Sequence, residues 1–239
     1  MRKKMAREYR TKIKDCIVSI FLCGDNCNIV FVPGLPQSID KHHPLVRQAE
    51  RLGCNLFIPQ YPGTHDSGGK LSVAGASEIV AETIKLAKSG QAAELYGGEM
   101  LKWNTGRVCA MGFSFGALPL LMQNQHVHKT MLVCPFVSMK FHNEKRKDAE
   151  NILETFDFLE KAYPWSYRFE KQALARELKE VKLPKRSDEI ILIYSMSDQV
   201  IPQEEIAFIK DLYKCKAFEK ADGHSAIMAD DMLEKILVG

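Results

Sequence analysis

The sequence of 239 residues lacks any apolar run of the roughly 18 residues that a membrane-spanning helix requires. Its first apolar stretch, residues 17–23, is short and follows Asp15, so we expect no cleaved signal peptide. An excess of one charge is also lacking, because 33 Lys and Arg residues stand against 30 Asp and Glu residues. A nucleic-acid partner is therefore not indicated, since it would need basic residues gathered on one face.

A disulfide framework is not indicated either. The 7 cysteines are an odd number, and most of them lie in apolar runs, where free cysteine packs as a small hydrophobic residue. This usage is typical of a reducing compartment and predicts a cytoplasmic protein. The pair Cys23 and Cys27 has no second pair at zinc-ligand spacing, and Gly-rich phosphate loops and nicotinamide or flavin fingerprints are missing. We therefore expect no metal and no cofactor.

Short apolar stretches alternate with helical patterns along the chain. Strands are expected at residues 9–14, 17–23, 28–32, 55–59, 107–111, 130–134, 189–195 and 216–219, with a tight turn at 24–26. Helices are expected at residues 38–52, 73–88, 115–125, 203–213 and 226–237. Buried strands that alternate with helices predict an α/β fold, with a mostly parallel, twisted sheet and helices on both of its faces.

Residues 139–187 interrupt this alternation with charged, aromatic and helical sequence. One expected helix face carries Ile152, Phe156, Leu159 and Tyr163, and a second carries Leu174, Leu178 and Val181. The aromatic residues of the segment are Phe141, Phe156, Phe158, Tyr163, Trp165, Tyr167 and Phe169. They either line an apolar binding pocket or pack the segment onto the rest of the chain, and the sequence leaves both alternatives open.

The stretch Gly112-Phe113-Ser114-Phe115-Gly116 has the form G-x-S-x-G between an expected strand and an expected helix. A nucleophile on such a tight turn adopts strained backbone angles, so the residues two positions away must be small. Gly112 and Gly116 fit that requirement, and Ser114 would project from the sheet near the amino end of the helix. The alternative is that Ser114 only caps a glycine-rich helix start.

Two later residues favour the catalytic interpretation. Asp198 follows the strand expected at 189–195, and His224 lies between the last expected strand and the closing helix. Serine, acid and histidine in this order are one of the known arrangements of a catalytic triad. His224 would take the proton of Ser114, and Asp198 would fix the imidazole tautomer. Asp222 is a competing acid, but its position beside His224 makes it hard for its carboxylate to reach the far side of the ring.

The other histidines that we considered as the base are less suitable. Those expected at surface loops or helix ends are His42, His43, His126 and His128. His65 follows a strand end and is placed near the expected cleft.

From about residue 17 to residue 237 the chain resembles the α/β-hydrolase superfamily. The resemblance rests on the stretches "IVFVPGLPQS", "GCNLFIPQYPGTHDSGG", "VCAMGFSFGA", "ILIYSMSDQVIP" and "DGHSAI". It implies an oxyanion loop after Gly34, in which the backbone N–H of Leu35 pairs with that of Phe115. Many members have His-Gly at this loop, whereas this chain has Pro33-Gly34; Leu35 can still donate a hydrogen bond, and Pro36 cannot.

The resemblance also implies that the chain forms one domain, with residues 139–187 inserted as a helical cap over the active site. The expected function is that of a serine hydrolase acting on small or acyl carboxylic esters, similar to small capped carboxylesterases and monoacylglycerol lipases. A thioesterase or a small-peptide hydrolase would use the same triad. A binding protein without activity would keep the fold but has no chemical need for all three residues.

Overall fold

An eight-stranded sheet forms the centre of the computed structural model, which describes residues 7–142, 147–162, 167–221, 223–224 and 231–238. The strands, in the order in which they lie side by side, are β1 (Glu8–Ile13), β2 (Cys16–Phe21), β4 (Cys54–Pro59), β3 (Cys27–Val32), β7 (Val108–Phe113), β8 (Lys129–Val133), β9 (Glu189–Ser195) and β10 (Lys216–Lys220). β2 is antiparallel to β1 and β4, and every other neighbouring pair is parallel. The expectation of a mostly parallel sheet is confirmed.

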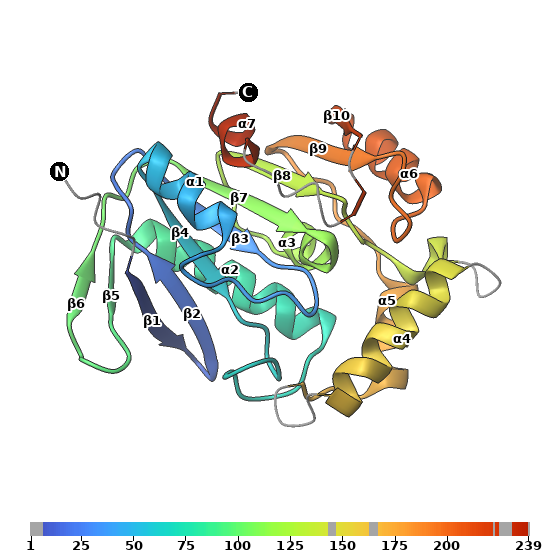
Figure 1. Ribbon diagram of the computed structural model, residues 1–239, viewed down its shortest axis with the longest axis horizontal. Helices are drawn as coiled ribbons and strands as arrows, with labels where there is room; N and C mark the ends of the chain where they lie inside the picture. Colours follow the sequence, from blue (N-terminus) through green and yellow to red (C-terminus); the bar gives the residue numbers. More distant parts are fainter. Residues whose placement is uncertain (1–6, 143–146, 163–166, 222, 225–230, 239) are drawn as a thin grey trace.

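Helices cover both faces of this sheet. α1 (Pro44–Leu52) and α7 (Met232–Val238) contact each other, and α2 (Val73–Ser89) contacts α3 (Ala117–Met122), one pair on each face (Figure 1). α6 (Gln203–Tyr213) packs beside β9. All residues of the central strands β3, β4, β7 and β8 are buried, because the sheet is covered on two sides. This explains why these strands read as continuous apolar runs.

The turn around Gly24 joins two strands that do not pair with each other, because β4 lies between β2 and β3. The side-chain Oδ1 of Asn55 accepts hydrogen bonds from the backbone N–H groups of Cys23 and Gly24. A Cβ on Gly24 would lie 2.6 Å from the carbonyl oxygen of Gly53. The turn is therefore fixed against the loop before β4. The chain passes from β2 across β4, and β3 thus lies between β4 and β7.

Two expected helices have different bounds in the structure. The helix expected at 38–52 begins only at Pro44, where the His43 side chain caps it by accepting from the N–H of Leu45. The helix expected at 115–125 divides into a 3₁₀ turn, η1 (Ser114–Gly116), and α3, which ends at Met122. Of the closing helix expected at 226–237, residues 226–230 lie outside the described residues, and α7 covers the rest from Met232.

The structure adds a small two-stranded sheet that the sequence does not reveal. It consists of β5 (Gln91–Ala93) and β6 (Met100–Lys102), which pair in antiparallel fashion. Strands of three residues are too short for their period-2 pattern to be recognised.

Between β8 and β9 the chain forms a 3₁₀ turn, η2 (Met139–Phe141), and two helices, α4 (Lys147–Ala162) and α5 (Lys171–Glu180). The two expected helices of this segment are therefore confirmed, and the apolar side chains Phe156, Leu159, Leu174 and Leu178 are buried. Ile152, Tyr163 and Trp165 lie outside the described side chains. The two helices lie on the side of the sheet to which the arrowheads of β7 and β8 point (Figure 1).

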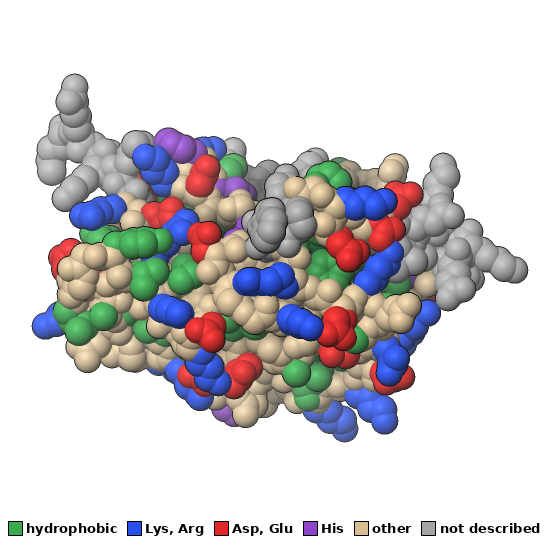
Figure 2. Space-filling model, turned by 90° about the horizontal axis from the view of Figure 1, so that it is seen from below, with side chains coloured by type: hydrophobic (Ala, Val, Ile, Leu, Met, Phe, Trp, Pro, Cys, Tyr) green, Lys and Arg blue, Asp and Glu red, His purple; other side chains and the backbone are tan. Residues whose placement is uncertain are grey.

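The surface carries both signs of charge, and Figure 2 shows Lys and Arg side chains interspersed with Asp and Glu side chains across one face. Exposed pairs such as Lys14–Glu78 and Lys70–Glu170 join segments that are distant in the sequence. All seven cysteines are free thiols, and the Sγ atoms of Cys27 and Cys54 on β3 and β4 lie 3.1 Å apart. No described helix combines the length and the apolar character that crossing a membrane would demand.

Candidate active site

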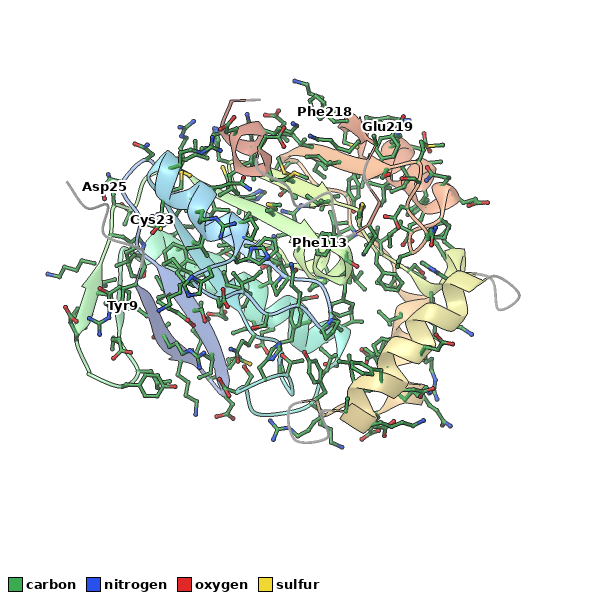
Figure 3. All side chains as sticks on the ribbon, viewed as in Figure 1. Tyr9, Cys23, Asp25, Phe113, Phe218 and Glu219 are labelled. Carbon is green, nitrogen blue, oxygen red and sulfur yellow. The ribbon has the colours of Figure 1, made fainter. Side chains whose placement is uncertain are left out.

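Ser114 lies directly after β7, in the middle of the sheet, with φ of 50° in the left-handed region. Figure 3 shows its neighbour Phe113 at this central position, between Tyr9 on β1 and Phe218 on β10. A Cβ on Gly116 would lie 2.0 Å from the carbonyl oxygen of Val32, and a Cβ on Gly112 would lie 2.8 Å from the Cα of Ala117. Both glycines are therefore required for the tight turn that projects Ser114 from the end of the sheet.

The structure brings His224 and Asp198 to Ser114. The Nε2 of His224 lies 3.1 Å from the Oγ of Ser114, and its Nδ1 lies 2.9 Å from the Oδ2 of Asp198. Both residues come from loops at the carboxyl ends of neighbouring parallel strands, Asp198 after β9 and His224 after β10. Asp222, the competing acid, lies outside the described residues.

Asp198 is held as a buried carboxylate. Its side chain is 2% exposed, and its Oδ1 accepts hydrogen bonds from the backbone N–H groups of Val200 (2.8 Å) and Ile201 (3.0 Å). Burial alone would raise the pKa of this carboxyl, but its hydrogen bonds and the attraction of His224 outweigh burial and lower the pKa. The group is therefore negatively charged at neutral pH.

Cys134, the first residue after β8, is a further neighbour of Asp198 that the sequence does not single out. Its thiol donates a hydrogen bond to the carboxylate, and burial together with that negative charge raises the thiol's pKa. Ligand atoms of Cys134, Asp198 and His224 lie within 4.8 Å of one another and could in principle hold a metal. A metal there would have to displace the hydrogen bond between Asp198 and His224.

The loop after β3 passes beside Ser114. A Cβ on Gly34 would lie 3.1 Å from the Cβ of Ser114, so a glycine allows this approach. The carbonyl oxygen of Gly34 accepts a hydrogen bond from the N–H of Gln37 at 3.0 Å. Because the C=O and N–H of a trans peptide point in opposite directions, this bond fixes the direction of the Leu35 N–H.

A cavity of about 180 Å³ adjoins Ser114. Its described lining residues are mainly apolar: Leu35, Ser114, Phe115, Phe136, Phe156, Val200 and His224. Phe156 comes from α4, so the segment 139–187 contributes directly to the wall of this cavity. Mainly apolar walls around the side chains of Ser114 and His224 suit an uncharged group placed beside the Ser114 hydroxyl.

A buried hydrogen-bonding network supports the loop between β8 and η2. The Glu205 Oε1 accepts hydrogen bonds from the N–H groups of Val137 and Ser138, and its Oε2 lies 3.0 Å from the Nε2 of His142. In the same loop the N–H of Phe136 donates to the carbonyl oxygen of Ser114 at 3.0 Å. Glu205 at the start of α6 therefore supports the backbone that contacts Ser114.

His142 and Glu205 carry little signal in the sequence, because a lone histidine before a helix and a glutamate in the first turn of a helix are common. The other described histidines, His42, His43, His65, His126 and His128, do not line the cavity at Ser114. His65 instead contacts Tyr167.

Comparison with solved structures finds similar folds in proteins of low sequence identity. The chain is similar to a Pyrococcus furiosus esterase (TM-score 0.68, 14% identity, 97% of this chain and 89% of that one). It is also similar to an α/β-hydrolase from a lagoon-sediment metagenome of Mar Chica, Morocco (TM-score 0.61, 17% identity, 96% and 95% covered). A third similar structure is the Francisella virulence factor BioJ (TM-score 0.64, 16% identity, 99% and 85% covered).

No protein-family model and no curated protein sequence matches the chain. The strand order, the helices on both faces and the structural likeness show that the chain has the α/β-hydrolase fold.

Proposed function

We propose that the protein is a serine hydrolase that cleaves carboxylic esters, with Ser114, His224 and Asp198 as its catalytic residues. The observation that carries this proposal is the pair of hydrogen bonds, 3.1 Å from Ser114 to His224 and 2.9 Å from His224 to Asp198. A serine hydroxyl is a weak nucleophile at neutral pH, and a base oriented by a carboxylate activates it. One of the similar structures is named an esterase, which agrees with this choice of substrate.

In the proposed reaction the Ser114 Oγ attacks the ester carbonyl carbon, and His224 takes the hydroxyl proton. The backbone N–H groups of Leu35 and Phe115 hold the resulting oxyanion, each contributing about 3 kcal/mol to lowering the barrier. His224 then gives its proton to the leaving alcohol, and the acyl group remains on Ser114. Water, deprotonated by His224, attacks the acyl-enzyme and releases the carboxylic acid.

The proposed function of residues 139–187 is that of a cap over the active site. Phe156 of α4 lines the cavity, and Tyr167 reaches the loop that carries Leu35. The first contact supports a role of this segment at the proposed acyl-binding site, and the second supports a role beside the loop of Leu35. A cap of this kind excludes water and selects the acyl group that lies beside Ser114.

A fluorophosphonate probe tests the proposed nucleophile. The Ser114 Oγ is expected to attack phosphorus and displace fluoride, which leaves one covalent label on Ser114 that peptide mass spectrometry locates. The Ser114→Ala variant is expected to take no label and to hydrolyse no p-nitrophenyl acetate above background. Wild-type protein that stays folded and unlabelled would favour a binding protein with the same fold and refute the proposal.

The cavity predicts a limit to acyl length. Each buried methylene contributes about 0.8 kcal/mol, so kcat/KM is expected to rise beyond acetate until the cavity is full. At about 30 Å³ for a water-sized group, 180 Å³ holds roughly six such groups, which places the optimum near hexanoate. A p-nitrophenyl ester series measures this, and a steady fall beyond acetate contradicts it.

Phe156→Ala is expected to move the optimum of the same series to longer acyl chains, because it removes an aromatic ring from the cavity wall. Phe158→Ala is the matched control, since Phe158 lies on the same helix and is 53% exposed. If the optimum moves equally in both variants, the effect comes from α4 as a whole, and the predicted role of Phe156 in the cavity wall is wrong.

A further inference from the structure

The loop of residues 33–37 contains two prolines, which have no N–H to donate. Other segments therefore hold this loop through its carbonyl oxygens. The hydroxyl of Tyr61, which is fully buried, donates to the carbonyl oxygen of Pro33 at 2.5 Å. This bond fixes the beginning of the loop, where β3 ends.

The end of the same loop is held by a tyrosine from the segment 139–187. The hydroxyl of Tyr167 lies 3.3 Å from the carbonyl oxygen of Pro36 and 3.2 Å from the Nε2 of His65. The rings of Tyr167 and His65 pack edge to face with centroids 5.3 Å apart. Because the Tyr167 hydroxyl donates its single proton to Pro36, the Nε2–H of His65 donates to the hydroxyl oxygen. His65 thus orients the hydroxyl that holds the carbonyl group of Pro36.

Tyr167 is itself fixed to the body of the protein. It is 5% exposed and forms a β-bridge with Thr64, and Phe169 forms a second bridge with Leu71. Between them, the N–H of Arg168 donates to Gly63 and its carbonyl accepts from Leu71, both at 2.7 Å. We call residues 167–169 the strap. The strap gives the Tyr167 hydroxyl a defined position relative to the loop.

We propose that Tyr167 is a positioning residue, whose hydroxyl, with His65, holds the loop so that the Leu35 N–H is directed at the developing oxyanion. The inference rests on the proposed ester hydrolysis. Leu35 stands between the two anchored ends of the loop, and its peptide is fixed by the bond from Gln37 to Gly34. A loop released at Pro36 can rotate this peptide away from the oxyanion while the substrate still fits the cavity. Loss of the hydroxyl is therefore expected to weaken the stabilisation of the transition state and not the binding of the substrate.

Tyr167→Phe tests the proposal, since it removes only the hydroxyl group. We expect kcat for p-nitrophenyl esters to fall about tenfold, a fraction of the loss of a whole oxyanion donor, and KM to change by less than about twofold. Tyr213→Phe is the matched control, because the Tyr213 hydroxyl also donates to a proline carbonyl, that of Pro184, at 3.0 Å. Tyr213 and Pro184 are not among the described residues that line the cavity, so Tyr213→Phe is expected to have wild-type kinetics.

An aryl trifluoromethyl ketone provides a readout that a merely structural role would not change. The Ser114 Oγ adds to its carbonyl carbon, the proton passes to His224, and the carbonyl oxygen becomes an oxyanion. Tyr167→Phe is expected to raise the Ki of this inhibitor by the same factor as it lowers kcat. An unchanged kcat and Ki, or a change in KM alone, overturns the proposal.

Thermal unfolding checks that the variants are folded. If Tyr167→Phe melts far below wild type, His65→Phe replaces it, since it keeps a ring against Tyr167 and removes both nitrogen atoms. His65→Phe is then expected to lower kcat and to raise Ki, and wild-type values of both overturn the proposal. Wild-type protein is assayed first, and its failure to hydrolyse esters would refute the proposed function rather than the role of Tyr167.

Discussion

Replacing Asp198 by Asn is expected to lower kcat about 10⁴-fold while the fold is retained. The Oδ1 of Asp198 accepts hydrogen bonds from the N–H groups of Val200 and Ile201. An asparagine must keep its oxygen at that position, which turns its NH₂ group toward the Nδ1 of His224. The Nδ1 atom must then accept a hydrogen bond, so the ring proton moves to Nε2. A protonated Nε2 can no longer accept the proton of Ser114.

The measurement is kcat with p-nitrophenyl acetate, together with the rate of fluorophosphonate labelling, which is expected to fall in parallel. Asp211→Asn is the matched control, because Asp211 is an exposed aspartate that pairs with Lys214 at the end of α6. Wild-type rates are expected for it. A loss of less than about tenfold in Asp198→Asn would mean that another group orients His224.

Replacing Gly116 by Ala is expected to lower the free energy of unfolding by about 4 kcal/mol. The new Cβ would lie 2.0 Å from the carbonyl oxygen of Val32 and 2.7 Å from that of Pro33. Both are backbone atoms, so no side chain can rotate away. Either the end of β3 or the turn that carries Ser114 must shift, which separates the nucleophile from the loop of Leu35.

Thermal denaturation measures this effect, and a fall in Tm of roughly 10 °C is expected for a chain of this length. Gly106→Ala is the control, because the nearest atom to its new Cβ, the Oδ1 of Asn104, is 3.7 Å away. Its Tm is expected to stay close to that of wild type. Equal melting temperatures for the two variants would contradict the tight packing of the turn at Gly116.

The sequence is sufficient to predict that the three candidate residues meet, because each of them lies at the end of a strand. Ser114, Asp198 and His224 each follow a strand, and the carboxyl ends of parallel strands meet at one edge of a sheet. The strand at Glu189–Ser195 and the helix at Gln203–Tyr213 were predicted with their observed bounds, since both have clear apolar periodicity.

The supporting residues could not be predicted, because their roles depend on which segments become neighbours. Cys134 reaches Asp198 only because β8 lies beside β9, and an isolated cysteine after a strand has no distinguishing pattern. Tyr167 was considered only as one aromatic residue of the segment 139–187. Its contact with Pro36 spans 131 positions in the sequence and arises from the strap. The start of α1 is a different case, because it could be predicted locally. Proline favours the first position of a helix, and α1 begins at Pro44 and not at residue 38 as expected.

The segment 139–187 is attached to the rest of the protein on both sides of α4, and this limits how the cavity at Ser114 can open. Toward its beginning, His142 is paired with the buried Glu205, and further on the strap binds the loop after β4. α4, which carries Phe156, lies between these two attachments. A displacement of α4 alone leaves both attachments intact. If the proposed ester hydrolysis is correct, substrate can enter and product can leave by displacement of this one helix, while the loop that carries Leu35 keeps its geometry from one catalytic cycle to the next.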